Sequence, residues 1–101
     1  MPKLYEYFGL IVLFFSREHE PIHVHGKYQD REMKAEIIVD QGEIVEIRIK
    51  PVSTRKPLLE PQLTDFEKVV GHYAKDIVQK WADFFLFGKS VPFTKIKKRI
   101  K

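Results

Sequence analysis

The run His19-Glu20-Pro21-Ile22-His23-Val24-His25 concentrates the side-chain chemistry of this sequence. His23 and His25 are two residues apart, so on a β-strand both imidazoles lie on one face, with Cα atoms roughly 6.5–7 Å apart. Two imidazoles at that separation can converge on one divalent metal ion, such as zinc, or on an anionic ligand. His19 can join them if the chain bends at Pro21, and Glu20 would add an oxygen ligand or a base.

Three interpretations of this histidine cluster stay open. In the first, His19, His23 and His25 are the metal ligands of a metal-dependent hydrolase in which Glu20 activates water. In the second, the histidines transfer protons without a metal, because an ordinary histidine pKa near 6.5 suits general acid–base work. In the third, they are polar residues of a half-exposed strand, hydrogen-bonded to backbone and carboxylates. No nucleophile signature or glycine-rich phosphate loop accompanies them, so it is undecided whether the protein is an enzyme.

The elements that would position the cluster are strands. Polar and apolar residues alternate over 22–28, over 32–39 after a turn at Gln29-Asp30, and over 45–50 after a turn at 40–43, which predicts half-buried antiparallel strands. In the last of these, Val45 is expected to share the inner face with Ile47. The nearly continuous apolar run from Tyr7 to Phe15 predicts a further, central strand that is covered on both faces.

A long amphipathic helix is predicted from about Asp65 to Phe87. Thr64 and Glu67 match a capping box, and Gly88 supplies a C-terminal stop. Between them, apolar residues recur at helical spacing, and we expect them to be core residues: Phe66, Val69, Val70, Tyr73, Ile77, Trp81 and Phe85. The sequence therefore predicts an α+β fold in which one long C-terminal helix covers a small antiparallel sheet of about four strands.

The net charge of +4 is unevenly distributed. Residues 1–94 carry 13 cations against 14 acids, whereas residues 95–101 hold five cations and no acid: Lys95, Lys97, Lys98, Arg99 and Lys101. We therefore expect a single α+β domain over residues 1–88 and a basic C-terminal tail over residues 89–101. Any binding of nucleic acid or another polyanion is expected in this tail.

Length and composition limit the class of protein. A chain of 101 residues has room for one hydrophobic core, and the absence of cysteine excludes both disulfides and thiolate zinc sites. The apolar run from Phe8 to Phe15 is too short to cross a bilayer, and the start of the chain lacks the pattern of a signal peptide. We expect a cytoplasmic protein without membrane contact.

Three features together resemble a small bacterial family catalogued as domain of unknown function 4160. They are the strand from Tyr7 to Val12, the run from Glu18 to His25 and the late helix with Trp81, and the resemblance covers roughly residues 2–85. The family usually has a second proline where this chain has Ile22. Its members are often encoded beside another small uncharacterised domain, in an arrangement similar to toxin–antitoxin or regulatory gene pairs. The resemblance implies a bacterial cytosolic protein with a small protein partner and no established reaction.

The leading hypothesis is therefore a small regulatory or interaction module that binds a partner protein, with nucleic-acid contact through residues 95–101. One alternative is the metal-dependent hydrolase. The other is a homodimeric structural protein, which an apolar first strand and a small core would suit.

Overall fold

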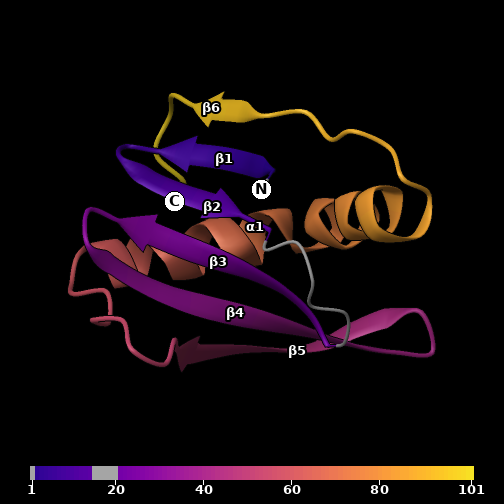
Figure 1. The fold of residues 1–101 in the computed structure, drawn as a ribbon, viewed down its shortest axis with the longest axis horizontal. Helices are drawn as coiled ribbons and strands as arrows, with labels where there is room; N and C mark the ends of the chain where they lie inside the picture. Colours follow the sequence, from indigo (N-terminus) through magenta and orange to yellow (C-terminus); the bar gives the residue numbers. More distant parts are fainter. Residues whose placement is uncertain (1, 15–20) are drawn as a thin grey trace.

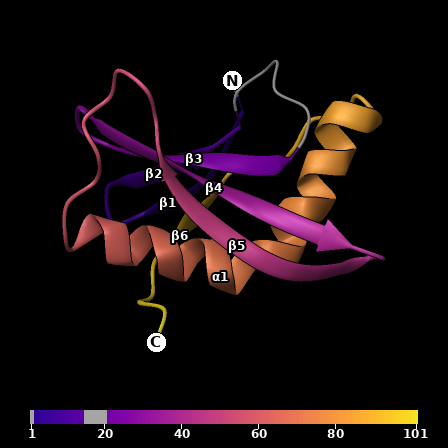
Figure 2. The ribbon, with the colours of Figure 1, turned by 90° about the horizontal axis from the view of Figure 1, so that it is seen from below.

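The computed structural model describes residues 2–14 and 21–101. Its elements, in chain order, are β1 (Lys3–Tyr7), β2 (Leu10–Leu13), β3 (Ile22–Tyr28), β4 (Arg31–Asp40), β5 (Glu43–Pro51), α1 (Gln62–Trp81), the π-helical turn η1 (Ala82–Leu86) and β6 (Thr94–Ile96). The strands form one sheet in the order β5-β4-β3-β2-β1-β6. Neighbouring strands are antiparallel except for the parallel pair of β1 and β6. The helix covers one face of this sheet (Figures 1 and 2), as the α+β prediction requires.

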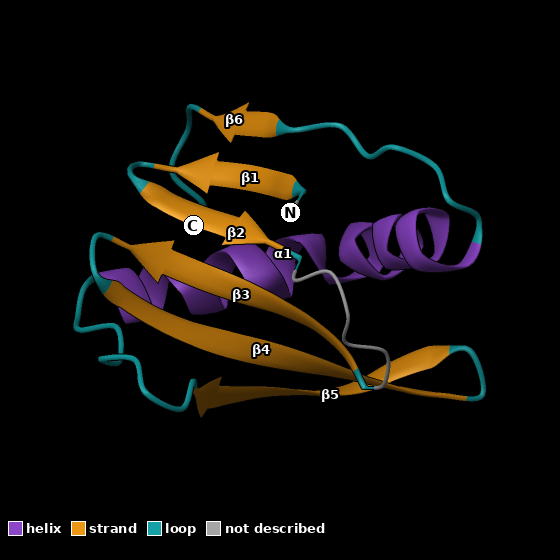
Figure 3. Ribbon diagram, in the orientation of Figure 1, coloured by secondary structure: helices purple, strands orange, loops and turns teal. Residues whose placement is uncertain are grey.

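The sheet has six strands, so the prediction of about four is wrong. The apolar run that begins at Tyr7 is not one strand, because the chain reverses at Phe8 and Gly9, whose φ angles of 48° and 91° close a tight hairpin between β1 and β2. Phe15, at the end of that run, lies outside the described residues. The second additional strand is β6, which lies in the basic segment and pairs with β1 (Figure 3).

Strands β3, β4 and β5 lie where polar–apolar alternation predicts them. The turn at Gln29-Asp30 pairs β3 with β4 so that Val24 faces Ala35 across the two strands. One detail of β5 is wrong in the prediction: a bulge opposite Val39 gives this strand an extra residue, Val45. Val45 is therefore 60% exposed instead of pointing inward with Ile47.

Helix α1 begins at Gln62, three residues before the predicted start. No side chain caps it, so the predicted capping box is wrong; the Thr64 hydroxyl donates instead to the Glu60 carboxylate. The backbone leaves helical geometry at Tyr73, and Figure 2 shows the helix changing direction along its length. Gly88, at a φ of 67°, follows the end of η1 and confirms the predicted stop. Among the described residues, no helix is long and apolar enough to cross a membrane.

Helix and sheet approach each other closely at Gly26 of β3. A Cβ atom at this position would lie 2.6 Å from the Phe66 ring, which is fully buried. The missing side chain lets α1 settle directly on the β3 backbone. Phe66 belongs to one core cluster with buried apolar residues from the sheet and along the helix: Val12, Val24, Ala35, Ile37, Val69, Val70, Ile77 and Trp81.

Gly26→Ala is expected to lower the free energy of unfolding by about 1–3 kcal/mol, because the added methyl group must displace the Phe66 ring. The matched control is Gly71→Ala in α1, where a Cβ meets nothing within 4 Å. Alanine is the better helix former, so this control should gain about 0.5–1 kcal/mol. Urea denaturation measures both changes. Wild-type stability in Gly26→Ala would show that the close approach imposes no constraint.

Candidate functional site

The sheet face that points away from α1 carries two of the predicted histidines. Strand β3 places His23 and His25 on this face, while Val24 between them joins the core. Their ring centroids lie 5.5 Å apart, and the side chains are 7% and 4% exposed. The structure thus brings His23 and His25 together as the alternation predicts. His19 and Glu20, the predicted third ligand and base, lie outside the described residues.

One ring nitrogen of each histidine is held by an acceptor. Nδ1 of His23 lies 2.8 Å from the carbonyl oxygen of Pro21, and Nδ1 of His25 lies 2.8 Å from Oε2 of Glu32. A carbonyl or an ionised carboxylate can only accept a hydrogen bond, so Nδ1 carries the proton in both rings. In the neutral imidazoles the lone pair is therefore on Nε2, the nitrogen that can coordinate a metal or accept a proton.

Glu32 was not among the predicted site residues. Its side chain is almost fully buried, and besides His25 it has an ion pair with Arg55, whose Nε is 3.5 Å from Oε1. A buried carboxylate needs such partners to stay ionised. The signal was present in the sequence: the turn at Gln29-Asp30 sets Lys27 opposite Glu32, which places Glu32 diagonally beside His25 on the same face.

A second carboxylate lies on the same face. Glu36 of β4 is paired directly opposite His23, is 7% exposed and forms an ion pair with Lys50, whose Nζ lies 2.9 Å from Oε1. The helix-free face therefore holds two buried imidazoles and two buried carboxylates, and each carboxylate is paired with a cation from another segment. Within residues 2–14 and 21–101, however, no three His, Asp or Glu side chains are grouped closely enough to hold a metal ion.

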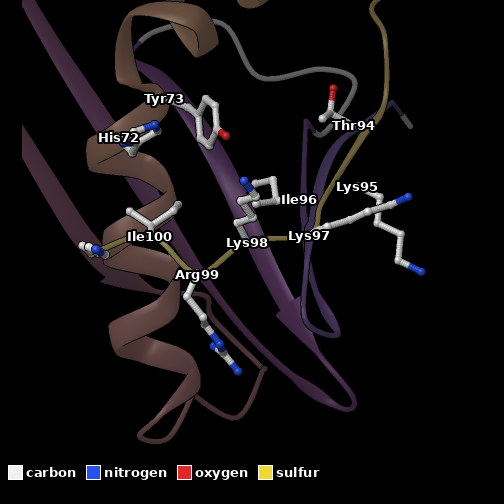
Figure 4. Close-up of a pocket in the computed structure, with 10 residues that line it drawn as sticks. His72, Tyr73, Thr94, Lys95, Ile96, Lys97, Lys98, Arg99 and Ile100 are labelled. Atoms are coloured by element: carbon white, nitrogen blue, oxygen red, sulfur yellow. The ribbon is translucent and has the colours of Figure 1, made fainter.

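A cleft of about 570 Å³ lies on the other side of the molecule, between α1 and residues 94–101. In Figure 4, His72 and Tyr73 of α1 face this segment and Lys98 extends toward Tyr73, whereas Arg99 extends away from these two residues and pairs with Asp65 in the first turn of α1. His72 was not among the predicted site residues, because a single helical histidine is usually a surface residue. Here it is exposed and lines the cleft.

The segment 94–101 is anchored to the domain at several points. Ile96 is buried in the core, and the backbone N–H of Ile100 donates to the Tyr7 hydroxyl at 2.9 Å. The Arg99 guanidinium lies 4.0 Å from the centroid of the Phe8 ring. The cations predicted to bind polyanions are therefore presented by an ordered backbone.

These five cations form two groups. Lys95 lies 3.8 Å from the Glu6 carboxylate, and Arg99 lies 3.4 Å from that of Asp65. In the part of the chain that the structure describes, no carboxylate lies within ion-pairing distance of the other three, Lys97, Lys98 and Lys101. Their charge is available to an external anion.

A cluster of titratable groups beside the cleft fastens β1 to α1. The Tyr5 ring stacks on Tyr73 with 4.7 Å between centroids, and its hydroxyl donates to the Asp76 carboxylate. The buried Lys80 ammonium lies 3.0 Å from Asp76 and 4.3 Å from the centroid of the Tyr5 ring. Burial and the bond to Asp76 raise the pKa of Tyr5 far above its usual range. Partial burial alone would raise the pKa of Asp76, but the hydrogen bonds from Tyr5 and Lys80 lower it overall.

The fold and these sites define a small two-layer α+β domain with a buried histidine–carboxylate cluster and a basic cleft. The chain belongs to the family described as domain of unknown function (DUF4160), whose model matches residues 9–82. This confirms the resemblance noted in the sequence. The matched range includes the histidine cluster and α1, and it excludes the basic segment 94–101. No curated protein and no solved structure matches the chain significantly.

Asp76→Asn is expected to destabilise the protein at neutral pH, and the difference from wild type should shrink in acid. The folded pKa of Asp76 is below its ordinary value of 3.8. The ionised carboxylate therefore stabilises the fold above that value, and the stabilisation is lost as pH falls through the folded pKa.

Urea denaturation at several pH values between about 3 and 7 tests this linkage. Asp83→Asn is the control, because Asp83 accepts a hydrogen bond from Gln79 on the helix surface and the amide keeps that acceptor. A difference between wild type and Asp76→Asn that is constant across the range would contradict the role of the charge.

Proposed function

We propose that this protein is a small interaction module that binds single-stranded nucleic acid through residues 94–101 and the adjoining cleft. The observation that carries the proposal is a group of three lysines on an anchored segment, for which residues 2–14 and 21–101 offer no carboxylate partner. Cations held by an ordered backbone lose less conformational entropy on binding than cations on a free chain. Each phosphate that they contact also releases condensed counterions, which favours association.

The distribution of charge supports a local footprint. Residues 1–94 carry slightly more acids than cations, so the positive potential is concentrated at the β6 edge of the sheet. In Figure 4, Lys95 and Lys97 extend away from the helix, while Lys98 extends toward it. A phosphate backbone that follows the β6 edge can therefore meet cations on both of its sides.

Aromatic rings beside the cations favour a single strand over a duplex. Phe8 is 44% exposed next to the Arg99 guanidinium, and Tyr73 lines the cleft. Unstacked bases stack on aromatic faces and guanidinium planes. A duplex cannot make these contacts, because its bases are already stacked on one another.

The double variant Lys97→Gln/Lys98→Gln should weaken binding to a fluorescent single-stranded oligonucleotide. Each lost phosphate contact should reduce the slope of log K against log salt by about 0.7, so the slope should fall by about 1.4. The matched control is Lys75→Gln/Lys89→Gln, which removes the same charge from exposed positions outside the cleft. Fluorescence anisotropy at several salt concentrations provides both quantities. Equal losses in the two variants would show a response to net charge alone, and no binding by wild type would refute the proposal.

A second candidate function, binding of a small partner protein, is favoured by a different observation. Leu86, Phe87 and Phe93 are 64%, 65% and 50% exposed, and all three lie at the ends of the connection between η1 and β6. Single exposed apolar residues are ordinary, but several large ones on one short segment are typical of a protein contact. A toxin–antitoxin-like or regulatory gene pair would supply such a partner.

The double variant Leu86→Ser/Phe87→Ser should prevent complex formation with the neighbouring gene product while preserving the fold, because neither side chain is buried. Size-exclusion chromatography with light scattering, applied to the chain alone and to the mixture, measures the complex. The control is Val45→Ser, which removes an equally exposed apolar residue at the bulge of β5. A stable dimer of wild-type chain that the double variant dissociates would assign the segment to homodimerisation instead.

A further inference from the structure

We propose that the outer edge of β5 binds the same edge of a second copy of this chain, so that two sheets continue into one across a two-fold axis. Strand β5 ends the strand order on the side opposite β6, as Figure 1 shows. Figure 2 looks at the molecule from this side. The surface does not involve the nucleic-acid footprint or the exposed residues Leu86 and Phe87, so the inference is independent of the proposed function.

The first support is the backbone of β5. This strand has nine residues, and in the described part of the chain its only strand partner is β4. Alternate residues of such an edge strand direct both their N–H and their C=O groups away from the partner strand, where another strand can pair with them. The strand at the opposite edge, β6, has only three residues. Strand β5 therefore offers the longer edge for extending the sheet.

The second support is the order of charges along β5. Glu46 and Arg48 lie on the helix-free face, and both side chains are about half exposed. In an antiparallel pair of β5 strands centred on Ile47, each Glu46 lies opposite Arg48 of the second copy, and such opposite charges stabilise a pair. A slip of two residues would set Glu46 against Glu46 or Arg48 against Arg48, and a slip of one would mismatch the faces. The charges therefore favour a second copy in a single register.

Within one chain these two side chains already form an ion pair. Nε of Arg48 lies 2.9 Å from Oε2 of Glu46, and a second guanidinium nitrogen donates to Oε1 at 3.1 Å. A single exposed ion pair contributes little, but several charges that form a network contribute more. Two such pairs placed face to face alternate in sign around the two-fold axis, so each carboxylate meets two guanidinium groups.

The third support is the apolar row on the inner face of β5. Ile44, Ile47 and Ile49 pack against the core from the edge of the sheet and are only partly buried. In the proposed pair Ile47 lies opposite Ile47 of the second copy, so the two side chains cover one another. Removal of this apolar surface from water favours association, in addition to the pairing of the backbone groups.

The distribution of charge over the whole chain also suits pairing at β5. The basic segment lies at the β6 edge, at the other end of the six-stranded sheet. Two copies joined at β5 keep their cationic edges at the two far ends of the combined sheet, where repulsion between them is weakest. Pairing at β6 would instead bring the cations of both copies together.

Cross-linking of full-length protein tests the register, because the natural chain has no cysteine. Ile47→Cys places one thiol from each copy at the axis, with Cβ atoms about 4.5–5.5 Å apart, close to what a disulfide requires. The matched control is Val45→Cys, which is more exposed but would lie roughly 10–13 Å from its equivalent. Mild oxidation should link most Ile47→Cys chains into dimers and leave Val45→Cys monomeric on a non-reducing gel. Preferential linking of Val45→Cys would overturn the proposal.

Charge exchange tests the contacts themselves. Sedimentation equilibrium should show a concentration-dependent dimer of wild type. Glu46→Arg and Arg48→Glu should each weaken it on the order of tenfold, because each variant replaces two attractive contacts by repulsive ones. A mixture of the two variants should dimerise again, since every Arg then faces a Glu. Glu67→Arg, the same change at an exposed position of α1, is the control for net charge and should dimerise as wild type does.

Three outcomes of the sedimentation experiment would overturn the proposal. They are a wild-type chain that stays monomeric at every concentration, a mixture of the two charge variants that does not dimerise, and a dimer that is lost in Leu86→Ser/Phe87→Ser. Recovery of the dimer only in the mixture supports the β5 pair, and it also shows that both variants are folded.

Discussion

The contact between the Phe66 ring and the bare backbone at Gly26 is the constraint on which the arrangement of this molecule depends. It brings α1 down onto β3 and commits one face of the sheet to the core. Because side chains alternate along a strand, the residues on either side of the core-facing positions are sent to the opposite face. His25, the neighbour of Gly26, is placed there for that reason, and His23 with it. The geometry of the histidine pair is thus a consequence of helix packing on the far side of the sheet.

The middle of the fold could be predicted from the sequence because its strands have one polar and one apolar face. Strands β3, β4 and β5 alternate with period two, and short breaks at Gln29-Asp30 and at Gln41-Gly42 separate their alternating runs. The β1–β2 hairpin gave no such signal: apolar residues flank it on both sides, and its turn places Phe8, an aromatic residue, at a positive φ that usually belongs to glycine or asparagine. Strand β6 is three residues long with only Ile96 buried, and its partner is about ninety residues away, so no local pattern could reveal it.

The residues of the candidate sites also divide into those that a local pattern could predict and those that depend on long-range contacts. The shared face of His23 and His25 is a local property of one strand and was predictable from spacing. To predict that Glu32 lies beside His25, the register of the hairpin must be known, and the two-residue turn at Gln29-Asp30 defines it. The cleft is formed by a long-range contact between α1 and residues 94–101, so the place of His72 in its lining could not be inferred from the sequence. The ion pairs of Lys95 and Arg99 also join residues far apart in the chain, so the division of the five cations into two groups could not be inferred either.

The parallel pairing of β6 with β1 also determines when the sheet can be completed during synthesis. Residues 94–96 follow the other strands and the helix in chain order, and until they have been synthesised the outer edge of β1 has unpaired backbone groups beside apolar side chains. Such an edge recruits strands from other chains. When β6 arrives it covers that edge and becomes the new one, and it brings lysines with it. Like-charged edges repel each other, so the segment that seals the sheet also protects newly made chains from aggregation.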